Sequence, residues 1–138
     1  MDLFSKDELL TAARSKQLPW ESVSLTLGGV TKQVIVQGMT SVERDAWEKS
    51  LVFFRPNGQR VLKTENVRAR LAVQCLVDKP GGSRIFSDDD AVVLGNLPAT
   101  ALAPIFDSAQ KLSGISDGDI DELKKSSELA AGSGSPTS

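Results

Sequence analysis

Hydrophobic and polar positions in the first part of the chain predict a short helix followed by a β-hairpin. Ser5 and Glu8 match a capping box, so a helix should begin there and run to about Lys16. Between Ser22 and Gln37, apolar residues alternate with polar ones on either side of Gly28-Gly29. This pattern is typical of two antiparallel strands joined by a two-residue turn.

A second helix and a turn are predicted next. Thr40 and Glu43 repeat the capping-box pattern, and the apolar residues that follow share one helical face. The helix should end before Arg55-Pro56, because the residue preceding a proline is steered out of the α region. Pro56-Asn57-Gly58 then predicts a turn. The apolar face comprises Val42, Ala46, Trp47, Leu51 and Phe54.

The most apolar helix is predicted in the middle of the chain. Thr64 can cap it, and from Leu71 to Val77 only Gln74 is polar. A helix that is apolar on nearly every side should be surrounded by other elements. The run Lys79-Pro80-Gly81-Gly82 should end it sharply.

Two more helices follow a short extended segment, Arg84-Ile85-Phe86. Ser87 should cap the first, and the three aspartates at 88–90 suit the positive end of its dipole. Gly95 should end it. The second helix should begin near Thr100 and close at Gly114, with one apolar stripe. That stripe comprises Leu102, Ile105, Phe106, Ala109 and Leu112.

A last helix and a tail complete the expected architecture. Ile115, Ser116 and Ile120 occupy the staple and cap positions of a helix from Asp117 to about Leu129. The sequence predicts an α+β fold, a helix-dominated single domain with one N-terminal antiparallel β-hairpin. The domain should span residues 1–130, with 117–130 as a mobile helix, followed by a flexible Gly/Ser-rich tail at 131–138.

Composition argues against most kinds of catalysis. The chain of 138 residues contains no histidine and no tyrosine, so it lacks the side chain most often used for general acid-base chemistry near neutral pH. Its 16 basic and 18 acidic residues give a net charge of -2, which provides no global field for a polyanion. We therefore expect a protein that is not an enzyme, takes no cofactor, and is unlike a general nucleic-acid binder.

The start of the chain and its cysteine content indicate a reducing cytoplasm. Met1 is followed by acidic and polar residues rather than by a signal-peptide pattern, and no apolar run approaches membrane-spanning length. The single cysteine, Cys75, lies in an apolar run and should be a buried residue rather than a reactive thiol.

Two acidic patterns resemble metal sites. Asp117, Asp119, Asp121 and Glu128 fall at positions 1, 3, 5 and 12 of a calcium loop, but Glu122 stands where that loop requires glycine. The consecutive aspartates at 88–90 would point in different directions on a helix. Helix capping is the better interpretation of both patterns, and no metal site is expected.

A basic strip and two tryptophans leave alternatives open. Arg55, Arg60, Lys63, Arg68 and Arg70 lie near two phenylalanines, an arrangement that could bind single-stranded nucleic acid. The phenylalanines are equally explained as part of an apolar helical face. Trp47 should fill the core, whereas Trp20 at a strand entrance could be core or a partner anchor.

Several segments, taken in order, resemble one known family. They begin with Gly38-Met-Thr-Ser-Val-Glu-Arg-Asp-Ala-Trp47 and Val67-Arg-Ala-Arg-Leu71, and continue through Leu76-Val77-Asp78. Arg84-Ile-Phe-Ser-Asp88, Phe106-Asp107 and Leu112-Ser113-Gly114 complete the pattern. In order and spacing, over about Val23 to Leu123, these segments resemble the tail assembly chaperones of long-tailed (siphovirus) bacteriophages, of the lambda type.

The resemblance implies a protein that binds the tape measure protein and keeps it soluble until tube subunits polymerise around it. It implies residence in the host bacterial cytoplasm and absence from the mature virion. Family members are often made in two lengths by ribosomal frameshifting, and the longer form is thought to recruit the tail tube protein. Lys124-Lys125 could be encoded by a slippery run. Self-association would be natural for a protein that lines a long client.

Two rival functions stay open, and the contact residues are harder to name. The rivals are a structural minor tail or connector protein of the virion, and a nucleic-acid-binding adaptor. An apolar surface with nearby charge is what a chaperone for a long helical client requires. The expected partner-binding residues are Phe53, Phe54, Arg55, Arg68, Arg70, Leu123 and Leu129.

Overall fold

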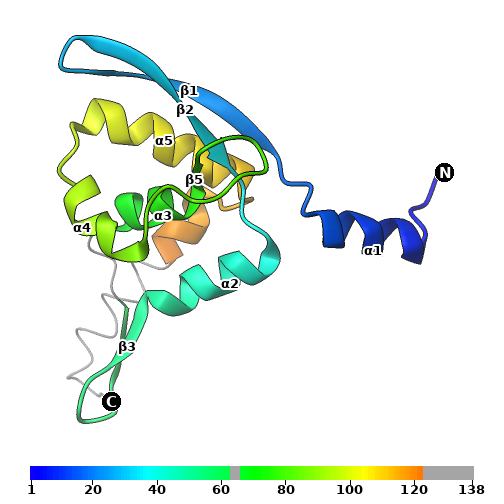
Figure 1. Cartoon of the computed structure of the whole chain (residues 1–138). Helices are drawn as coiled ribbons and strands as arrows, with labels where there is room; N and C mark the ends of the chain where they lie inside the picture. The colour runs from blue at the N-terminus through cyan, green and yellow to red at the C-terminus, as the bar shows by residue number, and fades with distance from the viewer. Residues whose placement is uncertain (63–65, 123–138) are drawn as a thin grey trace.

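The structure is a computed structural model and describes residues 1–62 and 66–122. It confirms the α+β class, the predominance of helices and the N-terminal hairpin (Figure 1). Thr64, the expected cap of the central helix, lies outside the described residues. The elements are α1 (Lys6–Ser15), β1 (Trp20–Leu27), β2 (Val30–Gln37), α2 (Ser41–Ser50), β3 (Val52–Phe54), β4 (Arg60–Leu62), α3 (Val67–Cys75), β5 (Leu76–Val77), η1 (Asp88–Asp90), α4 (Ala91–Leu94) and α5 (Ala99–Leu112).

The N-terminal hairpin is the larger part of an antiparallel sheet with strand order β1-β2-β5. Gly28 and Gly29 both have positive φ, 58° and 80°, as the tight turn between β1 and β2 requires. The first strand begins at Trp20, two residues earlier than expected, because Trp20 pairs with Gln37. The sheet lies across α5 (Figure 1), and its inner face covers that helix.

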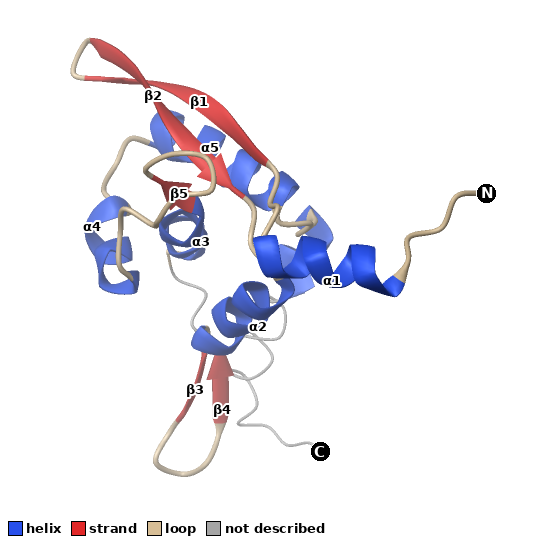
Figure 2. Ribbon diagram, turned by 45° about the vertical axis from the view of Figure 1, so that its right-hand side comes forward, coloured by secondary structure: helices blue, strands red, loops and turns tan. Residues whose placement is uncertain are grey.

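The helix predicted to reach Phe54 ends at Ser50 instead, so the placement of Phe53 and Phe54 on a helical face is wrong. Val52–Phe54 form β3, which pairs with β4 in a second antiparallel hairpin (Figure 2). The apolar spacing from Trp47 to Phe54 fits a helix, but a β-branched residue and two aromatics also favour a strand. Gly58, with φ of 85°, allows the chain to return and supply the partner strand.

The central helix is shorter at both ends than predicted. It begins at Val67, after Asn66 in the left-handed conformation with φ of 59°, and it ends at Cys75. Leu76 and Val77 are extended and pair with Val36 and Ile35, so they form β5 rather than a last helical turn. Pairing with the sheet outweighs helix propensity at these two apolar residues.

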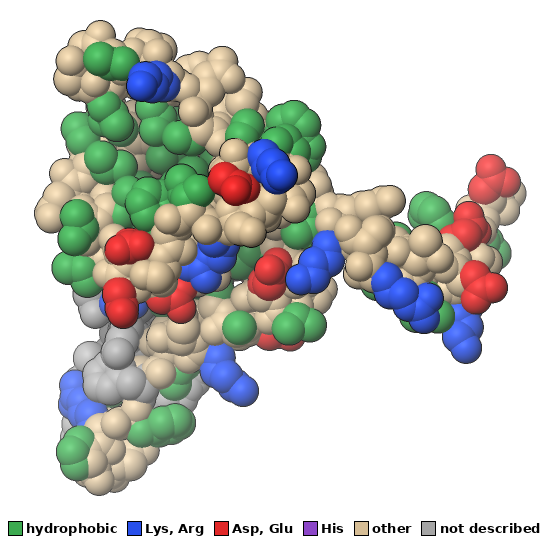
Figure 3. All heavy atoms as spheres, viewed as in Figure 1, with side chains coloured by type: hydrophobic (Ala, Val, Ile, Leu, Met, Phe, Trp, Pro, Cys, Tyr) green, Lys and Arg blue, Asp and Glu red, His purple; other side chains and the backbone are tan. Residues whose placement is uncertain are grey.

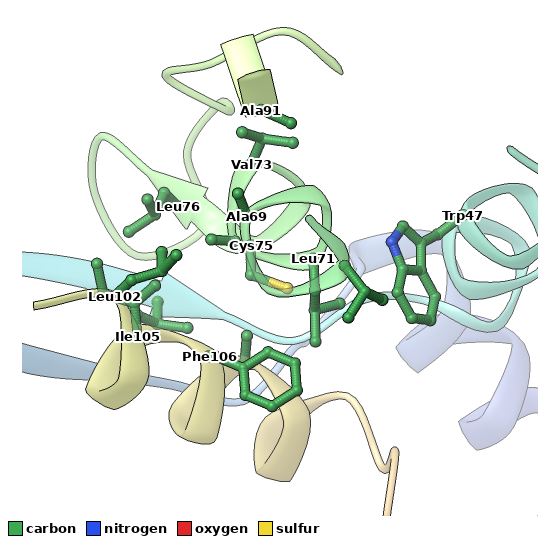
Figure 4. Close-up of a cluster of buried hydrophobic side chains, with 14 of the residues drawn as sticks. Trp47, Ala69, Leu71, Val73, Cys75, Leu76, Ala91, Leu102, Ile105 and Phe106 are labelled. Atoms are coloured by element: carbon green, nitrogen blue, oxygen red, sulfur yellow. The ribbon is translucent and has the colours of Figure 1, made fainter. Parts of the chain in front are cut away.

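The core surrounds α3, as its apolar composition predicts. Leu71 and Cys75 have no exposed surface, and Trp47 is only 2% exposed, which confirms the expected use of Trp47 as a core residue. Leu71 lies between Trp47 of α2 and Phe106 of α5 (Figure 4). The helix therefore joins the α2 side of the molecule to the α5 side. The predicted stripe on α5 is also confirmed, with Leu102, Ile105, Phe106 and Ala109 buried and Leu112 half-buried.

Polar contacts connect the C-terminal part of α5 to β1 and to the entrance of α2. Glu21 of β1 accepts hydrogen bonds from the Ser108 hydroxyl and from Lys111 Nζ, the latter at 2.9 Å. Met39 N donates to the Ser113 hydroxyl at 3.2 Å. These contacts hold the sheet and the entrance of α2 against one helix.

Three of the predicted capping residues, Ser5, Thr40 and Ser116, begin helices as expected. Ser5 with Glu8 and Thr40 with Glu43 form complete capping boxes. Ser116 N donates to Asp119 Oδ2 and Asp119 N donates to Ser116 Oγ, at 2.9 and 3.0 Å, at the start of a helix described over 117–122. The proposed helix end at Leu129 and the tail at 131–138 lie outside the described residues.

Candidate interaction surface

The second hairpin carries Phe54 and Arg55 to the surface. It projects from the lower end of the molecule (Figure 1), and Phe54 is 68% exposed. Two backbone hydrogen bonds close the turn, since Arg55 N donates to Gln59 O at 2.9 Å and Gly58 N donates to Arg55 O at 2.8 Å. The Arg55 guanidinium donates to the side-chain oxygen of Gln59 at 3.2 Å. This hairpin therefore presents an exposed aromatic ring beside a hydrogen-bonded turn.

Arg68 lies at the rim of a separate hollow between α3 and α5. Its guanidinium carbon is 5.5 Å from the centre of the Phe106 ring, a cation–π geometry that orients the side chain. The hollow has a volume of about 400 Å³ and a mixed polar and aliphatic lining. Besides Arg68 it is lined by Asn66, Val67, Gly95, Leu97, Ala99, Leu102 and Ala103. We call this the α3–α5 hollow.

Asn66 shapes the α3–α5 hollow and was missed by sequence reasoning. Its side-chain amide donates to the Ala91 carbonyl at 2.7 Å, which ties the start of α3 to α4. A Cβ at Gly95 would collide with the Asn66 amide, so the glycine leaves room for this side chain. The signal was the asparagine itself, because Asn is among the few residues that readily adopt positive φ.

Two exposed valines lie on α4, the short helix that leads into the same hollow. Ala91 of α4 is buried, whereas Val92 and Val93 are 70% and 71% exposed. Successive helical residues are about 100° apart, so a four-residue helix that buries Ala91 must expose its neighbours. The chain continues from them directly into Gly95 and Leu97 of the hollow. The sequence signal for these exposed valines was the apolar run Ala91-Val-Val-Leu94, because a helix this short cannot bury every side of such a run.

Arg70 does not share a surface with Arg68. The two are about 200° apart around α3, and Arg70 lines a different hollow, of about 190 Å³, with Trp47, Gln74 and Asp88. The structure therefore does not assemble Arg68 and Arg70 into one basic strip. Phe53 lies in β3, and Leu123 and Leu129 lie outside the described residues.

Trp20 is half exposed at the start of β1.

Both acidic patterns have structural roles where they are described. The Asp88 carboxylate accepts from Gln74 at 2.7 Å and from Arg84 at 2.8 Å, and Asp117 accepts from Gln110 at 2.7 Å. Glu128 lies outside the described residues, and within residues 1–62 and 66–122 no cluster of three or more Cys, Asp or Glu side chains could hold a metal ion.

The shifted titrations also trace to structural contacts. The backbone N–H and the hydroxyl of Ser5 lower the pKa of Glu8, and the same groups of Ser116 lower the pKa of Asp119. Hydrogen bonds from Ser108 and Lys111 lower the pKa of Glu21. Burial raises the pKa of the Cys75 thiol to about 11, which suppresses its thiolate. These groups cap helices, dock α5 or fill the core.

The described surface thus offers apolar contact (Figure 3), and the Arg68 guanidinium is oriented by the Phe106 ring. Hydrophobic side chains gather in that view along the side of the molecule formed by the hairpin, α5 and α4. Within the part of the chain that the structure describes, no helix has the length and apolar character needed to cross a membrane.

Comparison with protein-family models, with curated proteins and with solved structures finds no match to the chain.

Proposed function

We propose that the chain is a tail assembly chaperone of a long-tailed bacteriophage, which binds the tape measure protein and keeps it soluble before the tail tube forms. The observation that carries the proposal is that large apolar side chains are exposed on separate elements outside a complete core. Phe54 on β3, and Val92 and Val93 on α4, are each more than half exposed. Contiguous exposed apolar surface is a mark of sites that bind other proteins, and Val92 and Val93 are adjacent exposed residues.

The segments that carry the family resemblance also pack against one another. Gly38, at the start of the first segment, lies against the Leu112 carbonyl in the last. Arg44 donates to the Gly114 carbonyl at 3.2 Å and lies 3.5 Å from Asp119. Segments far apart in the sequence thus contact one another in the fold. These contacts support the proposal that the order of the segments reflects the fold of the tail assembly chaperone family rather than a series of unrelated helix starts.

The α3–α5 hollow is the proposed seat for a client helix. Val67, Leu97 and Leu102 in its lining suit the apolar face of an amphipathic helix. The exposed Val92 and Val93 lie on α4, the helix that leads into Gly95 of the hollow, and are proposed as an additional contact. Arg68 would pair with an acidic side chain of the client. Because Phe106 already orients the guanidinium, little side-chain entropy is lost when that ion pair forms. Phe54 and Arg55 provide a second point of contact.

Co-purification with the tape measure protein tests this assignment. Arg68→Glu, Val92→Asp and Phe54→Ala should each reduce the amount of captured tape measure protein. The reduction should be about tenfold for each side chain that becomes buried in the complex. Lys32→Glu and Val30→Ala are matched controls, since they make a similar change on the exposed tip of the first hairpin. Unchanged capture by all three variants would show that the surface is wrong.

The rival function, a minor tail or connector protein, makes a different prediction about the finished particle. A chaperone acts in the host cytoplasm and leaves before maturation, so quantitative mass spectrometry of purified virions should find the chain absent. A constant number of copies per particle would support the structural role instead. The frameshift-extended form and its contact with the tail tube protein belong to the chaperone proposal and are tested by expression of the intact gene.

A further inference from the structure

The N-terminal helix α1 has no partner in the described chain. All ten of its residues are exposed, and it stands away from the rest of the molecule (Figure 1). It is nevertheless amphipathic, because Leu9, Leu10 and Ala13 recur at spacings of three and four residues. Leu9 is 57% and Leu10 39% exposed, and Phe4 just before the helix is 77% exposed. An isolated helix of this length is marginal in water, so such a face requires cover.

An apolar groove lies beside the same helix. It has a volume of about 630 Å³ and runs between the end of α1 and the start of α2. Ala12, Ala13, Leu18 and Val42 form its apolar lining, and Val42 is 77% exposed. Ala13 belongs both to the groove and to the apolar face of α1, so the two surfaces are continuous.

The charges of α1 match those of a second, antiparallel copy. Asp7 and Arg14 are seven residues apart, nearly two full turns, so they lie along the same edge of the apolar face. If two copies of α1 pair with the symmetry axis between Leu10 and Thr11, each Asp7 lies level with Arg14 of the other copy. Two ion pairs then flank the leucines. A parallel pairing would instead place like charges level with each other.

The same alignment fills the groove. With the axis between Leu10 and Thr11, Lys6 at the start of α1 in one copy lies level with Ser15 at the end of α1 in the other, so Leu3 and Phe4, which precede the helix, extend past that end toward Leu18. The exposed residues that precede the helix therefore reach the groove between α1 and α2 of the second copy. One two-fold arrangement covers both unpartnered surfaces, and each copy gives and receives the same contact.

We propose that α1 is a dimerisation arm that pairs antiparallel with α1 of a second copy of this chain and inserts Leu3 and Phe4 into the second copy's groove between α1 and α2. The proposal does not depend on the chaperone function, because it uses neither the α3–α5 hollow nor Phe54. A dimer made through α1 leaves those surfaces open and doubles them.

Sedimentation equilibrium of the full chain tests the arm. The wild-type protein should sediment at twice its 14.7 kDa monomer mass at about 100 μM, and Leu10→Asp should weaken the dimer at least about tenfold. Asp7→Arg and Arg14→Asp should each weaken it, and the double variant should restore it. The double variant places both charges unfavourably for the helix dipole, so restoration can only come from pairing between copies.

Disulfide trapping gives the orientation. Leu10→Cys lies at the proposed axis and should cross-link two copies under mild oxidation, whereas Ser15→Cys on the opposite face should not. Native Cys75 does not interfere, because it is buried. A monomeric wild-type protein would overturn the proposal. A dimer that is insensitive to Leu10→Asp, a double variant without restoration, or a monomer that uses α1 to bind a tape measure peptide would also overturn it.

Discussion

Gly38 lies against the carbonyl of Leu112, with no room for a side chain between the entrance of α2 and the end of α5. Gly38 N also donates to the Pro19 carbonyl at 2.9 Å, so its backbone is held from the other side by the start of β1. Three elements therefore meet at a residue whose lack of a Cβ permits the contact. The glycine is fixed by this close approach and not by an unusual φ, since its φ is not positive.

Gly38→Ala should destabilise the fold by about 1–3 kcal/mol, the usual cost of overpacking a well-packed site. Urea unfolding followed by circular dichroism measures it. Gly118→Ala is the matched control: an added Cβ there meets only Ser116 Oγ at an ordinary 3.5 Å, and alanine favours the helix. Equal stability of the two variants would show that the contact between Gly38 and Leu112 is not close.

Trp47 should tolerate loss of its N–H far better than loss of its rings. The indole is buried and, within the described chain, its Nε1 has no hydrogen-bond partner. Trp47→Phe keeps most of the apolar volume against Leu71 and should cost less than about 2 kcal/mol, whereas Trp47→Ala leaves a cavity and should cost about 3–5 kcal/mol. Thermal unfolding of the two variants measures the difference, and a similar cost for both would indicate that the N–H is bonded.

Acidification should release the contact between the first strand and α5. The folded pKa of Glu21 lies below its ordinary value of 4.5, mainly because Ser108 donates to it. Because the folded pKa is lower than the unfolded pKa, the ionised carboxylate stabilises the fold at any pH above the unfolded pKa. That stabilisation is lost as the pH falls through the folded pKa. Glu21→Gln should therefore reduce stability at about pH 7, and the deficit should shrink at about pH 3.

The control for this titration is Asp45→Asn, which neutralises an exposed carboxylate on α2. Urea midpoints of the three proteins at both pH values provide the comparison. A deficit for Glu21→Gln that is the same at both values would mean that the carboxylate charge contributes nothing to the contact.

The Cys75 thiol should be unreactive until the core opens. Its pKa of about 11 and full burial leave little thiolate and no access for reagent. Labelling with a thiol reagent at about pH 8 should be absent from the native protein and reach one equivalent after denaturation. Rapid labelling of the native protein would show that α3 is exposed to solvent.

Local sequence signals predicted three of the helix starts because caps act over a few residues, whereas α3 begins at Val67, later than the expected cap Thr64. Ser5, Thr40 and Ser116 each engage the residue three positions ahead, so the chemistry is visible in the sequence. Helix ends were harder to predict. Val52–Phe54 fit both a helical face and a strand, and only pairing with Arg60–Leu62 decides between them. Leu76 became extended through pairing with Val36, a partner forty residues earlier.

The α3–α5 hollow could not have been predicted for a related reason. It joins Asn66 and Arg68 to Gly95, Leu97 and Leu102, residues that come together only when α4 folds back on α3. Arg68 was expected to be a contact residue, but its neighbours were expected to be Arg70 and the phenylalanines. Arg68 and Arg70 point to different sides of α3, because residues two apart in a helix lie about 200° apart around its axis. The cation–π contact with Phe106 gives Arg68 its position.

Co-expression with the tape measure protein of the same phage tests the central claim most directly. The measurement is the fraction of tape measure protein in the soluble lysate, with and without this chain. The account predicts that the tape measure protein aggregates alone, becomes soluble when the wild-type chain is present, and returns to the pellet with Arg68→Glu combined with Val92→Asp. An equal soluble fraction with and without the chain would contradict the account.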